Sequence, residues 1–573
     1  MKNQINKSKH ELNSFHLAIF GLFVLAFSIR IYGANAIGIT DSEAEVLLSV
    51  TGIKPSAAEP FFYSLIIQMM QFLGFNCTLG IRIINVLMGS LITILPALFY
   101  KEIGKKTAII ASLLFAFDPF GIANSIVFSG NSVTILLVGL LVDALIHDRE
   151  YLIQLVVLLL ICNGRGLGYF SIFSLIFLIV LFFVDKDTFY AFLKNIIEKT
   201  STKKNSMITW TSIIFVLFLA IIFKNPFSNI AADISNFILG LSKNYQIGNY
   251  PIVYPFAIFS YMPVALVFTL IFLIKKPEAE IKLHRLGSLW LGLVFAVITF
   301  YPRHLMIDLI WVSLPLWLIT SFLISKYFSV QYHLQKDNWP FLGILLVTEI
   351  NLGLNMVSLV YRSIWGLDVT NTLLTILLIS VFTIVLWLYQ AYVSSISKAL
   401  SALVLITLFM GGLVQLSISA RTAASNQKPE NEIIWNGYFE GRDIVGKIIE
   451  NTKTSITGTT GLLNIFIDGK INPSEIWLIN KERLFFQKSD ISSNNPEVVV
   501  SSNQAIAIRD DPYQGQEYIS NSYPLWTWDP VRSFISTDFW NWFFFRSNLQ
   551  YKEYNSIWIN KTFVNKQIIT GAN

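Results

Sequence analysis

Charge and cysteine are scarce in this chain. Charged side chains make up 14% of the 573 residues, whereas about 25% is usual in a soluble globular domain. The two cysteines, Cys77 and Cys162, lie in or beside apolar segments and offer neither a disulfide framework nor a metal-ligand spacing. The net charge of +6 does not indicate nucleic-acid binding, because the basic residues stand in short segments between apolar runs. We also find no convincing internal repeat, which transporters often have.

Long apolar runs dominate the sequence instead. Hydrophobic residues account for 54% of the chain, and stretches such as FHLAIFGLFVLAFSIRIY can cross a hydrocarbon core about 30 Å thick. We therefore predict a mainly α fold, a polytopic membrane helix bundle. The first run is long for a signal peptide and has only a weak cleavage match after it, so it is interpreted as a retained span. About thirteen spans are expected, at 15–33, 82–100, 107–123, 132–146, 151–163, 169–184, 208–223, 256–274, 287–301, 303–324, 340–361, 371–393 and 398–418.

Lysine and arginine predict the orientation, because they accumulate on the cytoplasmic side of a membrane. With the N-terminus in the cytoplasm, the predicted cytoplasmic segments hold 19 of these residues, against eight on the opposite side up to residue 418. An odd number of spans then places the rest of the chain outside. We expect a multi-pass protein of the cell membrane, with a cytoplasmic N-terminus and an external C-terminal domain.

The sequence changes character after residue 418. The tail has many charges, turns such as DGK and RDDP, and no membrane-length run. Its GRDIVGKIIEN has helical spacing, while LNIFID, EIWLI, PEVVV, AIAIR and YNSIWIN are typical of short strands. We predict a transmembrane domain over 1–418 and an external soluble α/β domain over 419–573. The aromatic segment YPLWTWDPVRSFISTDFWNWFFFR fits core packing or an interfacial belt, or a surface that grips acceptor, lipid or sugar rings.

The first external loop, residues 34–81, holds the first candidate site. Its GITDSEAEVLLS places Asp41, Glu43 and Glu45 beside the bilayer, where acidic groups lose hydration. Helix capping is one interpretation, because Asp41 with acids in the following turn is good helix-start chemistry. Capping explains one carboxylate better than it explains three, so catalysis or substrate binding by this loop is favoured. Later in the loop, Glu59 begins an expected helix along the membrane surface.

The chain resembles the membrane-embedded GT-C glycosyltransferases, in particular the family 39-like group that includes protein O-mannosyltransferases and the lipid A aminoarabinose transferase. The resemblance covers the first 180 residues and residues 300–325, where YPRHLMIDLIWVSLPLWL is similar to a later family signature. It implies a GT-C helix bundle that transfers a sugar from a polyprenyl-phosphate donor to an acceptor hydroxyl on the external face. The motifs that carry it are Asp41-Ser42-Glu43-Ala44, Glu59-Pro60-Phe61, Arg82-Ile83-Ile84 and Ser129-Gly130-Asn131.

The resemblance also implies roles for the acidic residues. An external carboxylate accepts the proton of the acceptor hydroxyl as general base, which we assign to Asp41, with Glu43 orienting the acceptor or sharing the role. The inserted Ser42 leaves open which of the two occupies the family's catalytic position. Two other departures are Glu59, which replaces the usual His, and Asn131, which stands where many relatives carry Asp.

Cations are expected to meet the donor phosphate, with arginine favoured for bidentate contacts. An arginine at the outer end of a span is often only a snorkelling anchor, and this alternative stays open for two of the candidates, Arg82 and Arg165. His304 departs from the family pattern, in which Tyr is common. The predicted phosphate-binding residues are Arg303, His304, Arg165 and Arg82.

The predicted substrate-binding residues are Glu59, Asn131, Asp118 and Lys243. Asp118 precedes Pro119 near the outer end of a span, where it faces the same cavity or caps a neighbouring helix. Lys243 lies in the outer loop 224–255, which fits either a lid or an interfacial amphipathic helix. No metal site is evident and no cofactor is certain, although a divalent cation at the acidic loop is an alternative. The expected partners are a polyprenyl-phosphate sugar donor, a protein, lipid or glycan acceptor, and membrane lipid, with no nucleic acid.

Other function classes remain open at this level. A lipid-linked sugar flippase or transporter would also have many spans, yet it usually carries charged groups near the midplane, whereas here they gather at one face. A membrane scaffold would leave the acidic loop unexplained. Transfer of a whole glycan is a third alternative, and the sequence has no WWDYG-type motif that would favour oligosaccharyltransferase.

Overall fold

The structure is a computed structural model. It describes residues 2–36, 39–50, 67, 69–70, 72–73, 77–127, 131–147, 149–163, 174, 176, 178–183, 186–187, 189–190, 235, 239, 253–274, 281–300, 306–331, 339–393, 395–424, 442–457, 463, 465–468, 471–480, 485–486, 497–502, 513–525 and 549–561. The predicted span at 208–223, half of the one at 169–184 and the strand predicted for AIAIR lie outside the described residues.

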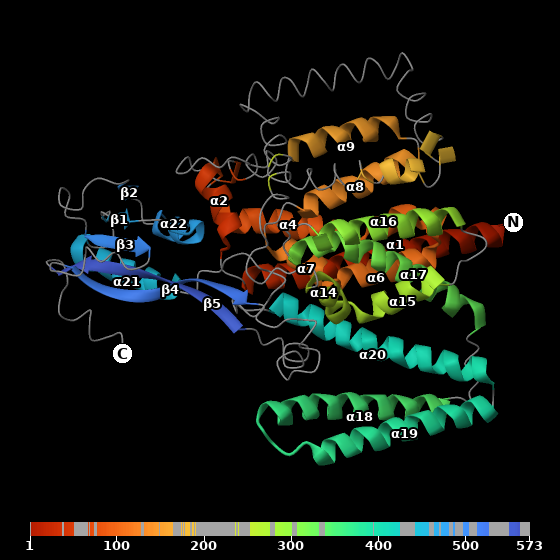
Figure 1. Ribbon diagram of the computed structural model, residues 1–573. Helices are drawn as coiled ribbons and strands as arrows, with labels where there is room; N and C mark the ends of the chain where they lie inside the picture. The colour runs from red at the N-terminus through yellow and green to blue at the C-terminus, as the bar shows by residue number, and fades with distance from the viewer. Residues whose placement is uncertain are drawn as a thin grey trace.

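Helices form the larger part of the molecule, and a small sheet lies at one end of them (Figure 1). The other predicted spans coincide with helices, as expected where about 20 apolar residues satisfy their backbone groups within one segment. These helices are α1 (Lys2–Ala36), α4 (Cys77–Thr93), η1 (Leu95–Phe99), α5 (Tyr100–Ile103), α6 (Lys105–Ala116), α7 (Pro119–Ile126), α8 (Asn131–Ile146), α9 (Glu150–Asn163), α14 (Val253–Tyr261), α15 (Pro263–Ile274), α16 (Ile281–Phe300), η3 (Met306–Leu309), α17 (Ile310–Gln331), α18 (Trp339–Ile364), α19 (Thr370–Val393) and α20 (Ile396–Ala424).

Length and apolar character identify the helices that can cross a membrane. Within the described ranges four segments qualify, and a fifth does if a bent pair counts as one span. The number thirteen therefore stays a prediction, while the chain's nature as a membrane protein with a helical fold is confirmed. The four segments are Ser14–Asn35, Arg82–Ile103, Gly343–Ser363 and Thr370–Val393, and the bent pair is Lys105–Ala116 with Pro119–Ile126.

The bend between α6 and α7 has a local cause. The two helices meet at 57°, and Asp118 stands between them as the N-cap of α7, with Pro119 at the first helical position. Proline suits that position because its missing N–H would have no partner in the first turn. The cap and the proline together start a new helix inside one apolar run.

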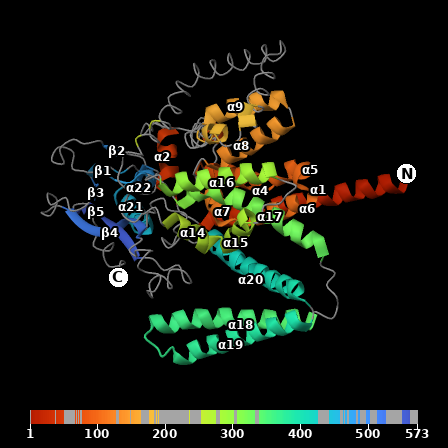
Figure 2. The ribbon, with the colours of Figure 1, turned by 45° about the vertical axis from the view of Figure 1, so that its right-hand side comes forward.

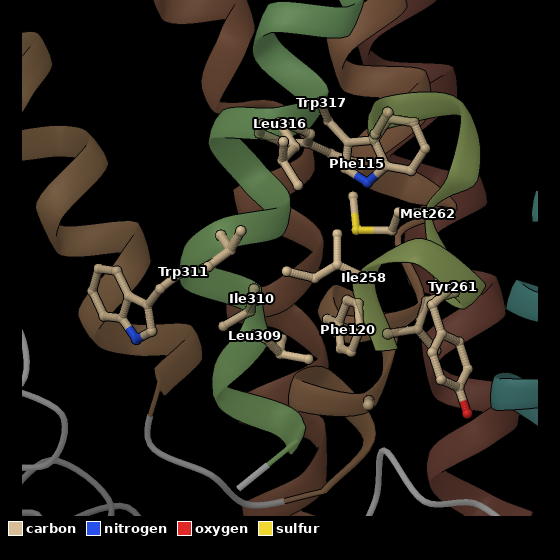
Figure 3. Close-up of a cluster of buried hydrophobic side chains, with 14 of the residues drawn as sticks. Phe115, Phe120, Ile258, Tyr261, Met262, Leu309, Ile310, Trp311, Leu316 and Trp317 are labelled. Carbon is tan, nitrogen blue, oxygen red and sulfur yellow. The ribbon is translucent and has the colours of Figure 1, made fainter. Parts of the chain in front are cut away.

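The main hydrophobic core lies among α6, α7, α14, α15 and α17, and Figure 3 shows part of it. Phe120 of α7 and Tyr261 of α14 meet edge to face, with ring centroids 5.7 Å apart. Trp317 of α17 is almost completely buried in the same cluster. Close-packed aromatic contacts of this kind fix α7, which carries Asp118, against its neighbours.

A helical hairpin of α18 and α19 stands apart from this core, joined to it through α20 in both views (Figures 1 and 2). Leu345 of α18 is buried against Ala402 and Ile406 of α20. Most of the other large apolar side chains of the hairpin are exposed. An apolar surface of this kind suits contact with lipid tails.

The sheet has five strands in the order β2-β1-β3-β5-β4. β1 is parallel to β2 and β3, while β5 is antiparallel to β3 and β4. Helices α21 (Arg442–Thr457) and α22 (Pro473–Asn480) pack on it through Val445, Ile449 and Ile479. We call these strands and helices the external unit, after the side of the membrane that the sequence predicts for them. The strands are β1 (Ile465–Asp468), β2 (Phe485–Phe486), β3 (Val498–Ser502), β4 (Tyr513–Leu525) and β5 (Leu549–Asn560).

One local prediction in this unit is wrong. EIWLI forms part of helix α22, although its short apolar run predicts a strand. The carbonyl of Asn472 accepts hydrogen bonds from the N–H groups of Glu475 and Ile476, and Pro473 takes the first helical position. These are ordinary helix-start features. The helix predicted for GRDIVGKIIEN and the strands predicted for LNIFID, PEVVV and YNSIWIN are confirmed as α21, β1, β3 and β5. The boundary predicted at 418 stays a prediction, and α20 continues to Ala424.

Candidate functional site

The acidic loop forms the first turn of a helix, α2 (Asp41–Val50). Thr40 Oγ1 accepts a hydrogen bond from the N–H of Glu43 (3.4 Å), and Glu43 Oε2 accepts one from the N–H of Thr40 (3.0 Å). This reciprocal pair is a capping box, which satisfies two backbone donors that the helix itself cannot pair. The helix start predicted for this loop is therefore confirmed, but its capping residue is Thr40 and not Asp41, and Glu43 contributes to the cap.

Glu43 is also bound by an arginine from the next membrane helix. Arg82 of α4 donates from Nε to Oε1 (3.0 Å) and from Nη2 to Oε2 (2.7 Å). The Glu43 side chain is only 2% exposed, and Nη1 of Arg82 donates to the carbonyl of Ala34 at the end of α1 (2.9 Å). A bidentate pair has defined geometry and strong hydrogen bonds. This pair fixes the start of α2 against α1 and α4.

Asp41 has a different partner, in the external unit. Its Oδ1 accepts hydrogen bonds from the backbone N–H (3.1 Å) and the hydroxyl (2.5 Å) of Ser474. Ser474 lies in the first turn of α22, whose N–H groups lack partners within the helix and favour a negative charge. α2 and α22 pack side by side, so the first external loop and the external unit meet at Asp41. Figure 1 shows both helices where the bundle meets the sheet.

Glu475 follows Ser474 and is completely buried. Its Oε2 accepts a hydrogen bond from Nδ2 of Asn555 on β5 (3.0 Å). Burial raises the pKa of Glu475 to about 8, partly offset by the Asn555 hydrogen bond and reinforced by the charge of Asp41. At neutral pH the carboxyl therefore retains its proton for most of the time. A neutral carboxyl and a carboxylate thus lie near each other at this junction.

Asp118 lies deep in the bundle, where it is fully buried. Its Oδ2 accepts from the N–H of Gly121 (2.7 Å) and the hydroxyl of Ser313 (2.8 Å), and its Oδ1 accepts from Nε1 of Trp317 (3.1 Å). The structure thus confirms the capping alternative for Asp118. Substrate contact by this residue stays a prediction.

Arg30, near the end of α1, is the cation whose charge acts on Asp118, and it is only 1% exposed. It donates from Nη2 to the carbonyl of Phe115 (3.2 Å) and from Nε to the hydroxyl of Ser125 (3.1 Å). These bonds satisfy a buried charge at the break between α6 and α7, which would otherwise be costly. Together, Arg30 and Asp118 fix α1, α7 and α17 beneath the candidate site.

Asn131 begins α8 and donates from Nδ2 to Oδ1 of Asp308 in η3 (2.8 Å). Both side chains are buried. The bond joins the start of α8 to η3. The role of Asn131 in substrate binding stays a prediction.

The remaining predicted site residues are not described by the structure. Glu59, Arg165, Lys243, Arg303 and His304 all lie outside the described residues. Within the described part of the chain, no group of three or more His, Cys, Asp or Glu side chains could hold a metal ion. The structure therefore brings together Asp41, Glu43 and Arg82 among the predicted residues, and places Asp118 and Asn131 in separate networks.

Four residues of these networks are not among the predicted site residues: Ser474, Glu475, Asp308 and Arg30. The pattern PSEIW does contain a helix-start signal for Ser474 and Glu475, since Pro, Ser and Glu favour a first turn. No local pattern could show that this turn meets Asp41, 433 residues earlier in the chain.

The long apolar helices define a membrane protein with a helical fold. No protein-family model and no curated protein sequence matches the chain. Among solved structures, it is similar to ArnT from Cupriavidus metallidurans bound to undecaprenyl phosphate, with a TM-score of 0.53 and 11% identity over 96% of this chain and 99% of ArnT. The apo state of the same ArnT gives a TM-score of 0.52 at 11% identity, over 97% of this chain and 100% of that one. The GT-C-type fold predicted from the sequence is confirmed.

Proposed function

We propose that the protein is a membrane glycosyltransferase that moves a sugar from a polyprenyl-phosphate donor to an acceptor hydroxyl on the external face. The observation that carries this proposal is the similarity, over nearly the whole chain, to ArnT bound to undecaprenyl phosphate. Fold alone does not determine function, so the proposal also depends on the residues at the junction of α2, α4 and α22.

Of the two acidic candidates, Asp41 is the better general base. Glu43 is buried, caps α2 and gives both carboxylate oxygens to Arg82. Removing those bonds for each reaction cycle would break a buried ion pair, which is costly. Asp41 is more exposed than Glu43, since it is half-buried, and it accepts two hydrogen bonds from Ser474 at Oδ1. We therefore assign the proton transfer to Asp41 and the anchoring of the loop to Glu43.

The transfer step itself balances without a cofactor. The acceptor hydroxyl oxygen attacks the anomeric carbon of the sugar while Asp41 takes the hydroxyl proton. The bond between that carbon and the phosphate oxygen breaks, and polyprenyl phosphate leaves with the electron pair. Cations near the phosphate would stabilise the negative charge that leaves. Arg303, His304 and Arg165 remain the proposed phosphate contacts, while Arg82 acts chiefly through Glu43.

The same reasoning extends the proposal to topology and partners. A lipid donor needs a site at the membrane surface, and the candidate carboxylates lie where the bundle meets the external unit. With the N-terminus in the cytoplasm, this junction is external and the protein is a multi-pass protein of the cell membrane. Glu59, Lys243 and Asn131 are the proposed contacts to sugar or acceptor, which is a protein, lipid or glycan hydroxyl.

A transfer assay tests the proposal. The protein is reconstituted in liposomes with a panel of labelled polyprenyl-phosphate sugars and with protein, lipid and glycan acceptors. We expect one sugar to be transferred, and we expect Asp41→Asn to lower the rate by about 10²–10⁴-fold, as is usual when a general base is lost. The matched control is Glu45→Gln, because Glu45 is an exposed carboxylate on the same helix.

Two results would contradict the proposal. Translocation of the lipid-linked sugar without transfer, unchanged by Asp41→Asn, would favour the flippase alternative. Transfer at the wild-type rate by a folded Asp41→Asn variant would retain the enzyme class and exclude Asp41 as the base. Circular dichroism and size-exclusion chromatography establish that each variant is folded before its rate is compared.

A further inference from the structure

The external unit contacts the membrane part directly at the proposed base. Ser474 donates both its backbone N–H and its hydroxyl to Oδ1 of Asp41, at 3.1 and 2.5 Å. Trp477, one turn further along α22, packs against the apolar cluster that includes Val46 and Leu47 of α2. The polar contact is therefore supported by apolar packing on the same two helices. Such packing fixes the position of α22 relative to Asp41.

A second carboxyl lies directly beside this contact. Glu475 is completely buried in the first turn of α22, and Asn555 of β5 donates a hydrogen bond to its Oε2 (3.0 Å). The charge of Asp41 opposes the ionisation of Glu475. Among the other ionisable side chains described on the surrounding elements, Glu43 pairs with Arg82. Lys453 of α21 and Glu497 just before β3 are half-buried, and Glu45 of α2, Lys447 and Glu450 of α21 and Tyr554 of β5 are exposed.

We propose that Ser474 and Glu475 of α22 are positioning residues for Asp41, so that the external unit completes the catalytic site of the membrane part. Ser474 donates two hydrogen bonds to Oδ1 and thereby sets the orientation of the Asp41 carboxylate. Glu475 in its neutral form lies next to Asp41 without adding a second negative charge. The inference depends on the proposed function, because a positioning role requires that Asp41 acts as the base.

A base that is displaced by about 1 Å can lose about 10²-fold in rate, because proton transfer needs a defined geometry. Ser474→Ala removes the hydroxyl bond and leaves the backbone N–H bond in place. We therefore expect kcat to fall by about tenfold, with the KM for the donor unchanged, since the altered contact is to the base. Ser474→Thr retains a hydroxyl at the same atom and should restore most of kcat.

If Glu475 acts on Asp41, ionisation of the Glu475 carboxyl should change the transfer rate with pH. A merely structural role would not produce this pH dependence. Above about pH 8 the carboxyl ionises, and two negative charges then repel each other across the α2–α22 contact. We expect the rate of the wild type to fall in this range. Glu475→Gln resembles the neutral carboxyl at every pH, so its rate should remain high where that of the wild type falls.

The experiment compares kcat and KM of wild type, Ser474→Ala, Ser474→Thr and Glu475→Gln from pH 6 to pH 9.5. Thr454→Ala is the matched control, because Thr454 is exposed and bonds to the Glu450 carbonyl within its own helix. Hydrogen–deuterium exchange of the first turn of α22 is measured in wild type and Asp41→Asn. We expect faster exchange in the variant, because the N–H of Ser474 loses a charged acceptor.

The outcomes separate the two proposals. An active wild type with unchanged kcat in Ser474→Ala and an unchanged pH profile in Glu475→Gln would overturn the positioning role alone. An inactive wild type with every donor would overturn the proposed function and this inference with it. In that case slow exchange in α22 that depends on Asp41 would show that the contact is structural only.

Discussion

Arg82 holds both carboxylate oxygens of Glu43, from Nε to Oε1 at 3.0 Å and from Nη2 to Oε2 at 2.7 Å. The pair separates the roles of two carboxylates that stand two positions apart in the sequence. Glu43 faces the bundle and is 2% exposed, whereas Asp41 faces the external unit. The first turn of α2 therefore has one carboxylate for anchoring and one for the proposed chemistry.

Glu43→Gln is expected to destabilise the protein strongly. The substitution leaves the Arg82 guanidinium, 13% exposed, without its counter-charge. Breaking a buried pair by removing one partner typically costs about 3–5 kcal/mol. Thermal unfolding in detergent should show a clearly lower melting temperature for Glu43→Gln. Glu45→Gln, exposed on the same helix, should melt like the wild type. Equal melting of all three proteins would mean that the ion pair does not stabilise the folded state.

Thr40→Ala is expected to weaken the start of α2. The variant loses the hydroxyl that accepts from the N–H of Glu43. An N-cap of this kind is worth about 1 kcal/mol, and Ser replaces Thr at little cost. The melting temperature should therefore fall modestly in Thr40→Ala and remain near the wild-type value in Thr40→Ser. A Thr40→Ser variant as unstable as Thr40→Ala would indicate that the methyl group, and not the cap, is the important part.

The sequence predicts the helices of this protein well because each membrane-length apolar run satisfies its backbone hydrogen bonds within itself. The start of α2 was also predictable, since Thr40, Asp41 and Glu43 form a local capping pattern. The division of roles between the two acids was not predictable. It depends on Arg82, 39 residues away, and on Ser474, 433 residues away. Contacts between residues so far apart in the sequence depend on how the helices pack, and a local sequence pattern contains no information about that packing.

The error at EIWLI has a related cause. A short continuous apolar run fits a strand or a buried helix equally well, and length is the usual discriminator. The deciding feature lies just before the segment, where Asn472 and Pro473 begin α22. The bend at Asp118 shows the opposite case, because its Asp-Pro sequence gave a local signal for the cap that the structure confirms.

Ser313→Ala is expected to destabilise the bundle without changing donor binding. The serine hydroxyl donates to Oδ2 of Asp118 (2.8 Å), and both residues are fully buried. Losing one hydrogen bond to a charged group costs about 1.5–3 kcal/mol. The melting temperature should fall, while the KM for the lipid donor stays within about twofold, because the Ser313 hydroxyl lies against Asp118 and the Ile310 carbonyl inside the bundle.

Asp118→Asn provides the stronger version of this test. The amide keeps the size of the side chain and removes the charge near Arg30. A large fall in melting temperature with an unchanged donor KM would assign Asp118 to folding alone. A raised KM in a protein that melts normally would instead support the predicted contact between Asp118 and substrate.

Glu475→Gln is expected to stabilise the protein at alkaline pH. The pKa of Glu475 is about 8 in the folded protein and has an ordinary value of 4.5 when the chain is unfolded. Between these values the folded state keeps a proton that the unfolded state has lost, so stability decreases as pH rises through this window. Below pH 4.5 there is no cost, and above pH 8 the cost is complete. Glutamine does not titrate and avoids it.

Melting temperatures at pH 5, 7 and 9 test whether the stability of the wild type falls as pH rises. The advantage of Glu475→Gln over the wild type should be small at pH 5 and should increase at each step to pH 9. Glu450→Gln is the control, because Glu450 is an exposed carboxylate on α21. It should follow the wild type at all three values. An advantage that is equal at every pH would show that the substitution acts through packing, and that the Glu475 carboxyl is already ionised in the folded protein.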